Sequence, residues 1–305
     1  MSLAVLEQPL LASDEIAALA AQATLLVQGT ARREVHDHHA GDWPSAWLGR
    51  GLDFEEARPY APGDDVRDMD WRTTARLGHP FIKTYREERQ PLLHLVLDRG
   101  PSMRFGTRRR LKVTQAARLA LLAGFAASAQ NVAVGLTLWD GADRTLPARH
   151  GRAGWLEAVQ ALIAPCPPLP AERGEAQHED VRLQALRAEL PRGSRLLLLS
   201  DFAWLSALHE RALASLGEHC DALAVCLHDV AERELPDVGL ACFADPAGGP
   251  ARWLDTGRAQ VRAAHALAFA RRQGEVEERL ARCGLRTLRV AADADDLLSL
   301  LHAHG

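Results

Sequence analysis

The chain has 305 residues, of which 47 % are hydrophobic and 25 % are charged, and this composition excludes a disordered or fibrous protein. Its formal net charge of −4 argues against a general nucleic-acid binder, because the surface that binds nucleic acid is usually basic. The five cysteines are scattered and show no Cys-x-x-Cys spacing, which argues against a disulfide framework and favours a reducing compartment.

The N-terminal stretch MSLAVLEQPLLASDE has no basic residues ahead of its apolar ones and no clear cleavage site, so we expect no signal peptide. The uncharged run Leu119–Trp139 is long enough to span a membrane. Gln130-Asn131 interrupts it, however, and the pattern changes there from helical to strand-like. We therefore expect a buried helix, a turn and a buried strand in a cytoplasmic protein without membrane insertion.

Residues 1–90 combine one helical segment with loops and charged stretches. Ser13-Asp14-Glu15 supplies a cap and acidic first-turn residues, so a helix is expected to begin there. Residues 29–51 are rich in His, Gly, Asp, Trp and Pro, a composition that indicates a loop in which short strands can occur. Residues 52–89 are dense in charge, and Phe81–Tyr85 has the pattern of a strand.

From Leu92 onward, strands alternate with helices. Nearly continuous apolar runs such as Arg195–Asp201 are typical of parallel strands that are covered on both faces. The alternation predicts a doubly wound α/β fold, in which a mostly parallel sheet has helices on both faces. Strands are expected at 92–98, 131–140, 195–201, 221–229 and 285–290, helices at 112–129, 154–163, in a segment ending near Leu190, 205–218, 258–282 and 294–303, and a hairpin at 240–256.

Two aspartates end the buried runs: Asp98 closes LLHLVLD and Asp201 closes RLLLLSD. Ligands bind at the carboxyl ends of strands in open parallel sheets, so both side chains are expected to face one crevice. With the hydroxyl of Ser102 they supply oxygen ligands of the kind that Mg²⁺ prefers. The alternative is that each aspartate caps the turn or helix that follows it, with no metal.

The segment Ala57–Arg76 interleaves aspartates with arginines around one tryptophan, and Pro62-Gly63-Asp64 marks a turn. So many opposite charges predict a network of charge-assisted hydrogen bonds, either purely structural or also used to engage a partner. Clustered carboxylates hold catalytic metals in nucleases, so a metal-dependent nuclease or phosphatase that uses the Asp64–Asp70 cluster is the enzymatic alternative. The Glu-x-Lys that usually accompanies such a site is missing.

Two further polar clusters are interpreted as exposed. His36-Asp37-His38-His39 could bind a metal but is expected to be a loop. Arg108–Arg110 and Lys112 open the helix that follows the Asp98 turn, and phosphate binding is the alternative to a solvated helix start. No Gly-x-x-x-x-Gly-Lys-Ser/Thr or Gly-x-Gly-x-x-Gly stands between a strand and a helix, so nucleotide binding has no support.

The pattern Gly-Asp-Asp-x-Arg-x-x-Asp-Trp, at Gly63–Trp71, is similar to the hallmark of the domain of unknown function 58 family. Residues 49–60 and 79–89 extend the similarity on either side. The resemblance implies a bacterial protein in which an N-terminal signature segment, here residues 1–90, precedes a von Willebrand factor A-like domain, here residues 91–305.

Asp98, Gly100 and Ser102 align with the Asp-x-Ser-x-Ser motif of von Willebrand factor A domains, whose serines and a threonine help to hold Mg²⁺. Gly100 replaces the first serine, and the stretch where the threonine is expected, Ala171–Asp180, contains neither Thr nor Ser. The resemblance therefore implies a degenerate metal site formed by Asp98, Ser102 and Asp201, which would hold Mg²⁺ weakly.

Members of the family typically accompany a MoxR-type AAA+ ATPase. The resemblance thus implies a non-enzymatic, chaperone-like adaptor that works with such an ATPase on an unknown client protein. A metal-free structural interaction module is a further alternative. The residues expected to bind the partner or to support the signature are Arg58, Asp64, Asp65, Arg67, Asp70, Trp71 and Arg76.

Overall fold

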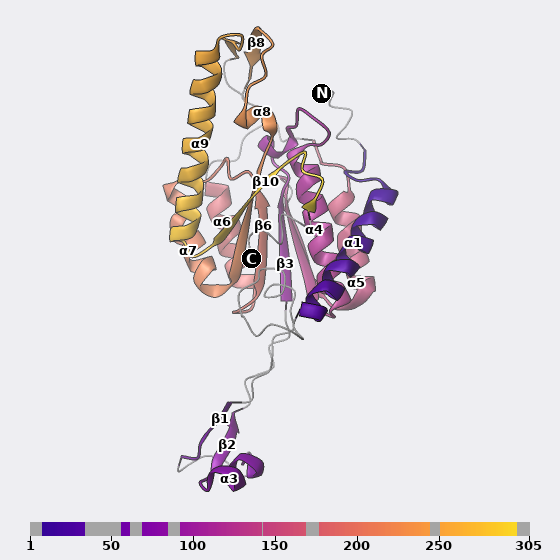
Figure 1. Ribbon diagram of the computed structural model, residues 1–305, viewed down its shortest axis with the longest axis vertical. Coiled ribbons are helices and arrows are strands. Elements are labelled where there is room, and N and C mark those ends of the chain that lie inside the picture. The colour runs from indigo at the N-terminus through magenta and orange to yellow at the C-terminus, as the bar shows by residue number, and fades with distance from the viewer. Residues whose placement is uncertain are drawn as a thin grey trace. The chain divides into compact units, whose positions relative to one another are not determined.

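The computed structural model describes residues 8–33, 56–61, 69–84, 92–141, 143–168, 177–244 and 251–297. It divides into two compact units, which are residues 1–49 together with 92–305, and residues 50–91 (Figure 1). Each unit is described by itself below.

The larger unit is built on a six-stranded sheet. Its strands are β3 (Leu92–Asp98), β4 (Ala133–Trp139), β5 (Arg144–Arg149), β6 (Arg195–Ser200), β7 (Asp221–His228) and β10 (Arg286–Ala291). They lie in the order β10-β7-β6-β3-β4-β5, and all are parallel except the edge strand β5, which runs antiparallel to β4. From β3 the chain winds towards β4, and from β6 it winds the other way, so the topology switches between β3 and β6.

Helices cover both faces of this sheet (Figure 1). One face packs against α1 (Ser13–Arg33), α4 (Lys112–Ala129) and α5 (Gly151–Ile163), and the other against α6 (Gln177–Glu189), α7 (Glu210–His219) and α9 (Ala259–Arg282). Successive strand residues serve opposite cores, so that Leu95 and Leu97 belong to the first and Val96 to the second. These features confirm the predicted α/β fold with a mostly parallel sheet, helices on both faces and an N-terminal helix.

Helix α4 is buried almost all round because the sheet covers one side and α1 covers another. Leu19, Ala23 and Leu26 of α1 belong to this core. Helix α1 is therefore part of the larger unit, whereas the sequence groups it with the signature segment in residues 1–90. The smaller unit ends at Pro91, next to the boundary that the sequence predicts.

In the smaller unit, β1 (Glu56–Pro59) pairs antiparallel with β2 (Phe81–Thr84), and α3 (Trp71–Leu77) lies between them in the chain. Gly78 ends α3 in the left-handed conformation, with φ of 76°, and its N–H bonds to the Thr74 carbonyl. Strand β2 falls within the strand expected at the end of this segment.

The remaining described elements of the larger unit are short: η3 (Ser102–Arg104), η4 (Ala207–His209), α8 (Val230–Arg233), β8 (Leu240–Phe243) and β9 (Arg252–Asp255). Strands β8 and β9 form the expected hairpin as a two-stranded sheet of their own. Most of the helix expected at 294–303 lies outside the described residues. Among the residues that are described, no helix combines the length and apolar character that a membrane span requires.

Candidate functional site

The two strand-end aspartates lie where the sheet topology switches. Asp98 is the last residue of β3, and Asp201 follows directly after β6, which is its neighbour in the sheet. This is the position at which open α/β sheets bind ligands. Both side chains are buried, and the Ser102 hydroxyl lies 3.1 Å from Asp201 Oδ1. The structure thus brings together the three residues that the sequence predicts for a metal site.

Hydrogen bonds occupy both carboxylate oxygens of Asp98. The Gly100 N–H donates to Oδ1 at 2.8 Å, and the Ser200 hydroxyl donates to Oδ2 at 2.6 Å. Burial raises the pKa of Asp98 to about 6, and the nearby charge of Asp201 adds to this rise. Asp98 therefore caps the turn that follows it, as the metal-free alternative expects.

Ser200 precedes Asp201 in the chain and bonds to Asp98. It is fully buried, and its oxygen accepts the Phe202 N–H at 2.9 Å and the Trp204 indole N–H at 3.2 Å while its proton goes to Asp98. The backbone of Phe202 has a φ of 53°, which is unfavourable for a bulky residue. The hydrogen bonds of Ser200 hold this turn in place, so the strained backbone is part of how the site is shaped.

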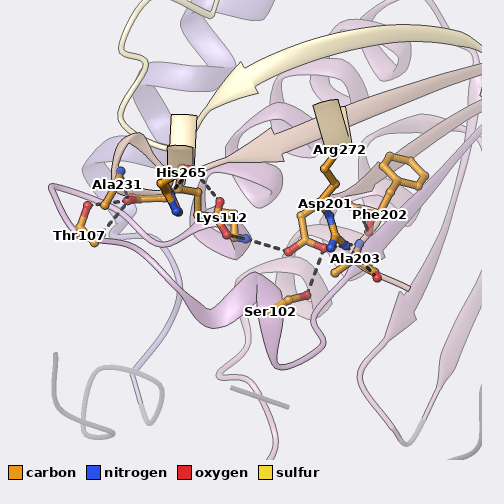
Figure 2. Close-up of polar contacts among 12 residues, drawn as sticks. Ser102, Thr107, Lys112, Asp201, Phe202, Ala203, Ala231, His265 and Arg272 are labelled. Carbon is orange, nitrogen blue, oxygen red and sulfur yellow. Dashed lines mark hydrogen bonds and ion pairs between the residues drawn. The ribbon is translucent and has the colours of Figure 1, made fainter. Parts of the chain in front are cut away.

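Three donors hold the carboxylate of Asp201 (Figure 2). The Ser102 hydroxyl and the Ala203 N–H donate to Oδ1 at 3.1 and 3.0 Å. The Lys112 ammonium donates to Oδ2 at 2.7 Å. Asp201 thus caps the turn at Ala203 and not the helix that follows, where Ser206 provides the cap.

Lys112 links Asp201 to Glu232, which lies on α8 after strand β7. It is the first residue of α4, it is 1 % exposed, and its ammonium also donates to Glu232 Oε1 at 2.6 Å. Burial lowers the pKa of Lys112, but the attraction of the two carboxylates outweighs burial and leaves that pKa raised, so the lysine is charged. The interpretation that places Lys112 in a solvated helix start with Arg108–Arg110 is wrong for this residue.

Glu232 is oriented by the turn that follows β7. Its Oε2 accepts the Asp229 N–H at 2.8 Å, while the Asp229 carboxylate accepts the Ala231 N–H and the Thr107 N–H, both at 2.9 Å. This reciprocal arrangement is a capping box at the start of α8. We use the term strand-end network for the six side chains at these strand ends. They form two hydrogen-bonded groups, which are Asp98 with Ser200, and Asp201 with Ser102, Lys112 and Glu232.

The donor set of the strand-end network does not fit the Mg²⁺ ion that the resemblance implies. Mg²⁺ needs oxygen lone pairs in near-octahedral geometry, whereas Asp201 already binds an ammonium. Gly100 supplies no side-chain oxygen, and a Cβ at this position would lie 3.0 Å from Asp98 Oδ1. Within the described parts of the chain, no group of three or more His, Cys, Asp or Glu side chains is placed to hold a metal ion.

The smaller unit holds the described part of the Gly-Asp-Asp signature. Asp70 is the N-cap of α3 and accepts the N–H groups of Arg72 and Thr73, both at 3.1 Å, and the Thr73 hydroxyl at 2.6 Å. Its carboxylate therefore has a structural role. Trp71 begins the helix and is 66 % exposed, and Arg76 lies in its last turn. Arg58 lies on β1, whereas Asp64, Asp65, Arg67, His36, His38 and His39 lie outside the described residues.

Sequence reasoning missed three members of the strand-end network, namely Lys112, Ser200 and Glu232. Lys112 lies 89 positions from Asp201 and 120 from Glu232, and a single sequence does not reveal such contacts. One signal was available, because the chain has two lysines among its 36 basic residues. Lysine and arginine differ in geometry and hydration, so a rare lysine in an arginine-rich chain is a candidate for a specific role.

Sequence comparison assigns the chain to a family. The chain belongs to the family described as "Protein of unknown function DUF58", whose model matches residues 56–275. The matched region contains the Gly-Asp-Asp signature and both strands that carry the aspartates. This confirms the family that the signature indicates.

Among individual proteins, the chain is 33 % identical over 277 residues to the uncharacterised protein Rv1480 of Mycobacterium tuberculosis, covering 88 % of this chain and 82 % of that protein. The uncharacterised protein Mb1516 of Mycobacterium bovis matches with the same values. Two solved structures are also similar at 15 % identity. The conserved hypothetical protein BatB from Bacteroides thetaiotaomicron has a TM-score of 0.40, with 67 % of this chain and 91 % of that chain covered. An aerotolerance-related membrane protein from Bacteroides fragilis has a TM-score of 0.45, with 70 % and 96 % covered.

Proposed function

We propose that the protein is a non-enzymatic, cytoplasmic adaptor that binds a MoxR-type AAA+ ATPase and acts in a chaperone-like way on a client protein. Membership of the DUF58 family supports the proposal, because the family resemblance implies this partner. All five cysteines are free thiols, and four of them are buried, which suits a reducing compartment.

The exposed indole of Trp71 is the observation that carries the proposal. Asp70 fixes the start of α3, so Trp71 is presented from a capped helix. No side chain of α3 is buried, and Trp71 belongs to neither hydrophobic core that the described residues form. Tryptophan is enriched at the centre of protein interfaces, where it contributes much of the binding energy. An outward-facing tryptophan in the family signature therefore favours a partner-binding role.

Co-purification with the MoxR-type ATPase tests the proposal. The two purified proteins would be combined with ATP, with ADP, with a non-hydrolysable ATP analogue and without nucleotide, and we expect association in at least one of these states. In that state, Trp71→Ala is expected to weaken the affinity by about tenfold, which corresponds to about 1.4 kcal/mol.

Trp253→Ala is the matched control. Trp253 lies on β9 and is also 66 % exposed, so its removal takes away the same exposed surface from another element. We expect this variant to bind the ATPase as tightly as the wild type does. Absence of association in every nucleotide state contradicts the proposal, and an equal loss of affinity in both variants contradicts the role of Trp71.

A further inference from the structure

One positive charge lies inside the strand-end network. The Lys112 ammonium is 2.7 Å from Asp201 Oδ2 and 2.6 Å from Glu232 Oε1. Figure 2 shows Lys112 directed at Asp201 from one side and Ser102 directed at it from another. The ammonium therefore binds the same carboxylate that the predicted Mg²⁺ ion would need.

The residue type at this position is informative. The chain uses arginine for its basic residues almost throughout and has two lysines among 36. A guanidinium is a planar fork, whereas an ammonium is a compact point charge with three hydrogen-bond donors. Two carboxylates from different strand ends can approach such a centre closely. The ammonium of Lys112 is therefore closer to a small metal ion than a guanidinium would be, because both are compact charges that two carboxylates can approach.

Both carboxylates are oriented to receive the ammonium. The Ala203 N–H and the Ser102 hydroxyl hold Asp201, and the Asp229 N–H holds Glu232. A buried ion pair is stable when its geometry is good and when further hydrogen bonds satisfy the remaining lone pairs. The strand-end network meets both conditions with its own side chains and backbone.

We propose that Lys112 is the built-in cation of the strand-end network, so that its ammonium takes the place of a divalent metal ion and excludes one. Gly100 agrees with this assignment, because a network without metal needs no hydroxyl at that position and uses the Gly100 N–H to hold Asp98. The inference goes beyond the adaptor function and does not rest on it, since it concerns the charge balance of the site and not its partner.

Mn²⁺ binding to the full chain, followed by electron paramagnetic resonance, tests the inference. We expect no saturable Mn²⁺ binding by the wild type. Lys112→Met removes the charge and keeps the side-chain length, and it is expected to create saturable Mn²⁺ binding that the wild type lacks. Adding Asp201→Asn to this variant is expected to abolish the gain. Arg118→Met is the matched control, because it removes another buried cation of α4, paired with Glu15 at 2.7 Å, and is expected to leave Mn²⁺ affinity unchanged.

Saturable binding of Mn²⁺ by the wild type that Asp201→Asn abolishes would overturn the inference. Equal Mn²⁺ affinity in the wild type and in folded Lys112→Met would also overturn it. If Lys112→Met does not fold, Lys112→Gln repeats the measurement with a neutral polar side chain. If neither variant folds, the wild type is compared with Asp201→Asn alone, and identical titrations support the inference.

Discussion

His94 and Asp98 are buried titratable residues of one strand, β3, and burial shifts their pKa values in opposite directions. Burial in the sheet lowers the pKa of His94 to about 4, and the Nε2 atom of the ring lies 2.8 Å from Thr137 Oγ1. Burial raises the pKa of Asp98 to about 6. In both residues burial favours the neutral form over the charged form. Because the neutral form of His94 lacks a proton and that of Asp98 carries one, the two residues have opposite effects on the free energy of unfolding at acidic pH.

The pH dependence of stability should separate these two effects. In the unfolded chain His94 is protonated below about pH 6.5, whereas in the native state it stays neutral down to about pH 4. This residue therefore lowers the free energy of unfolding by about 2 kcal/mol between pH 7 and pH 5. Asp98 acts in the opposite sense, since its raised pKa favours the native state as the pH falls through about 6. Between pH 7 and pH 5, the free energy of unfolding should therefore fall less in His94→Gln than in the wild type. In Asp98→Asn it should fall more than in the wild type.

Urea unfolding at pH 7 and pH 5 provides the measurement, with the difference between the two free energies compared across the wild type and both variants. Comparing differences removes the constant cost of each substitution. If the pH difference is the same in all three proteins, the assigned shifts are incorrect.

At the level of single residues, the sequence predicts the site residues that lie at or just after the end of a strand. Asp98 and Asp201 could be identified because each closes a buried apolar run, and Ser102 because it lies in the turn that follows Asp98. Lys112 and Glu232 could not, because their roles depend on which strands become neighbours in the sheet. The helical periodicity around Lys112 carries no sign that its ammonium points inward.

The packing of α4 on α5 depends on one close approach. A Cβ added at Gly124 would lie 2.0 Å from Trp155 Cη2, and the Trp155 ring is itself buried. We expect Gly124→Ala to destabilise the protein by about 1–3 kcal/mol, because the ring must move within a closely packed core. The free energy of unfolding, measured in urea at pH 7, checks this expectation.

Gly274 in α9 provides the matched control for this substitution. It is also a helical glycine, but an added Cβ there meets no atom within 4 Å. Gly274→Ala is expected to stabilise the protein by about 0.5–1 kcal/mol through helix propensity. Stabilisation by both substitutions would contradict the close packing of α4 on α5.

The sequence predicts the helices and strands that are covered on both faces. It predicts the half-exposed ones less well. The continuous apolar runs of β3 and β6 distinguish them from their surroundings, and the Ala- and Leu-rich α4 begins and ends where the pattern indicates. Strand β5 has no such run, because it lies at the sheet edge with mostly exposed residues and accommodates Pro147. Its existence depends on pairing with β4, which local pattern does not encode.

At the scale of the whole molecule, α1 is part of the larger unit although residues 50–91 separate it from β3 in the chain. Removal of residues 1–33 should therefore expose the apolar surface of α4 that Leu19, Ala23 and Leu26 cover. Each fully buried leucine contributes about 1.5–3 kcal/mol, so we expect a loss of several kcal/mol and binding of a hydrophobic dye.

Replacing residues 50–91 with a flexible Gly/Ser linker is the control, because it removes the smaller unit and keeps α1. This variant is expected to retain the thermal midpoint of the larger unit, measured by circular dichroism. A truncated chain without α1 that melts as cooperatively as the full chain would contradict the assignment of α1 to the larger unit.

The burial of Lys112 also gives the molecule an internal reporter for amine chemistry. Acylating reagents modify the free amine of lysine, and the Lys112 ammonium is both enclosed and held charged by two carboxylates. Acylation at this position therefore requires a local opening of the strand-end network, so its rate measures how often that opening occurs. Because the chain has two lysines, peptide mass spectrometry can assign the product without ambiguity. A bound partner that loosens or tightens this end of the sheet would change the rate at Lys112, even if it never touches that residue.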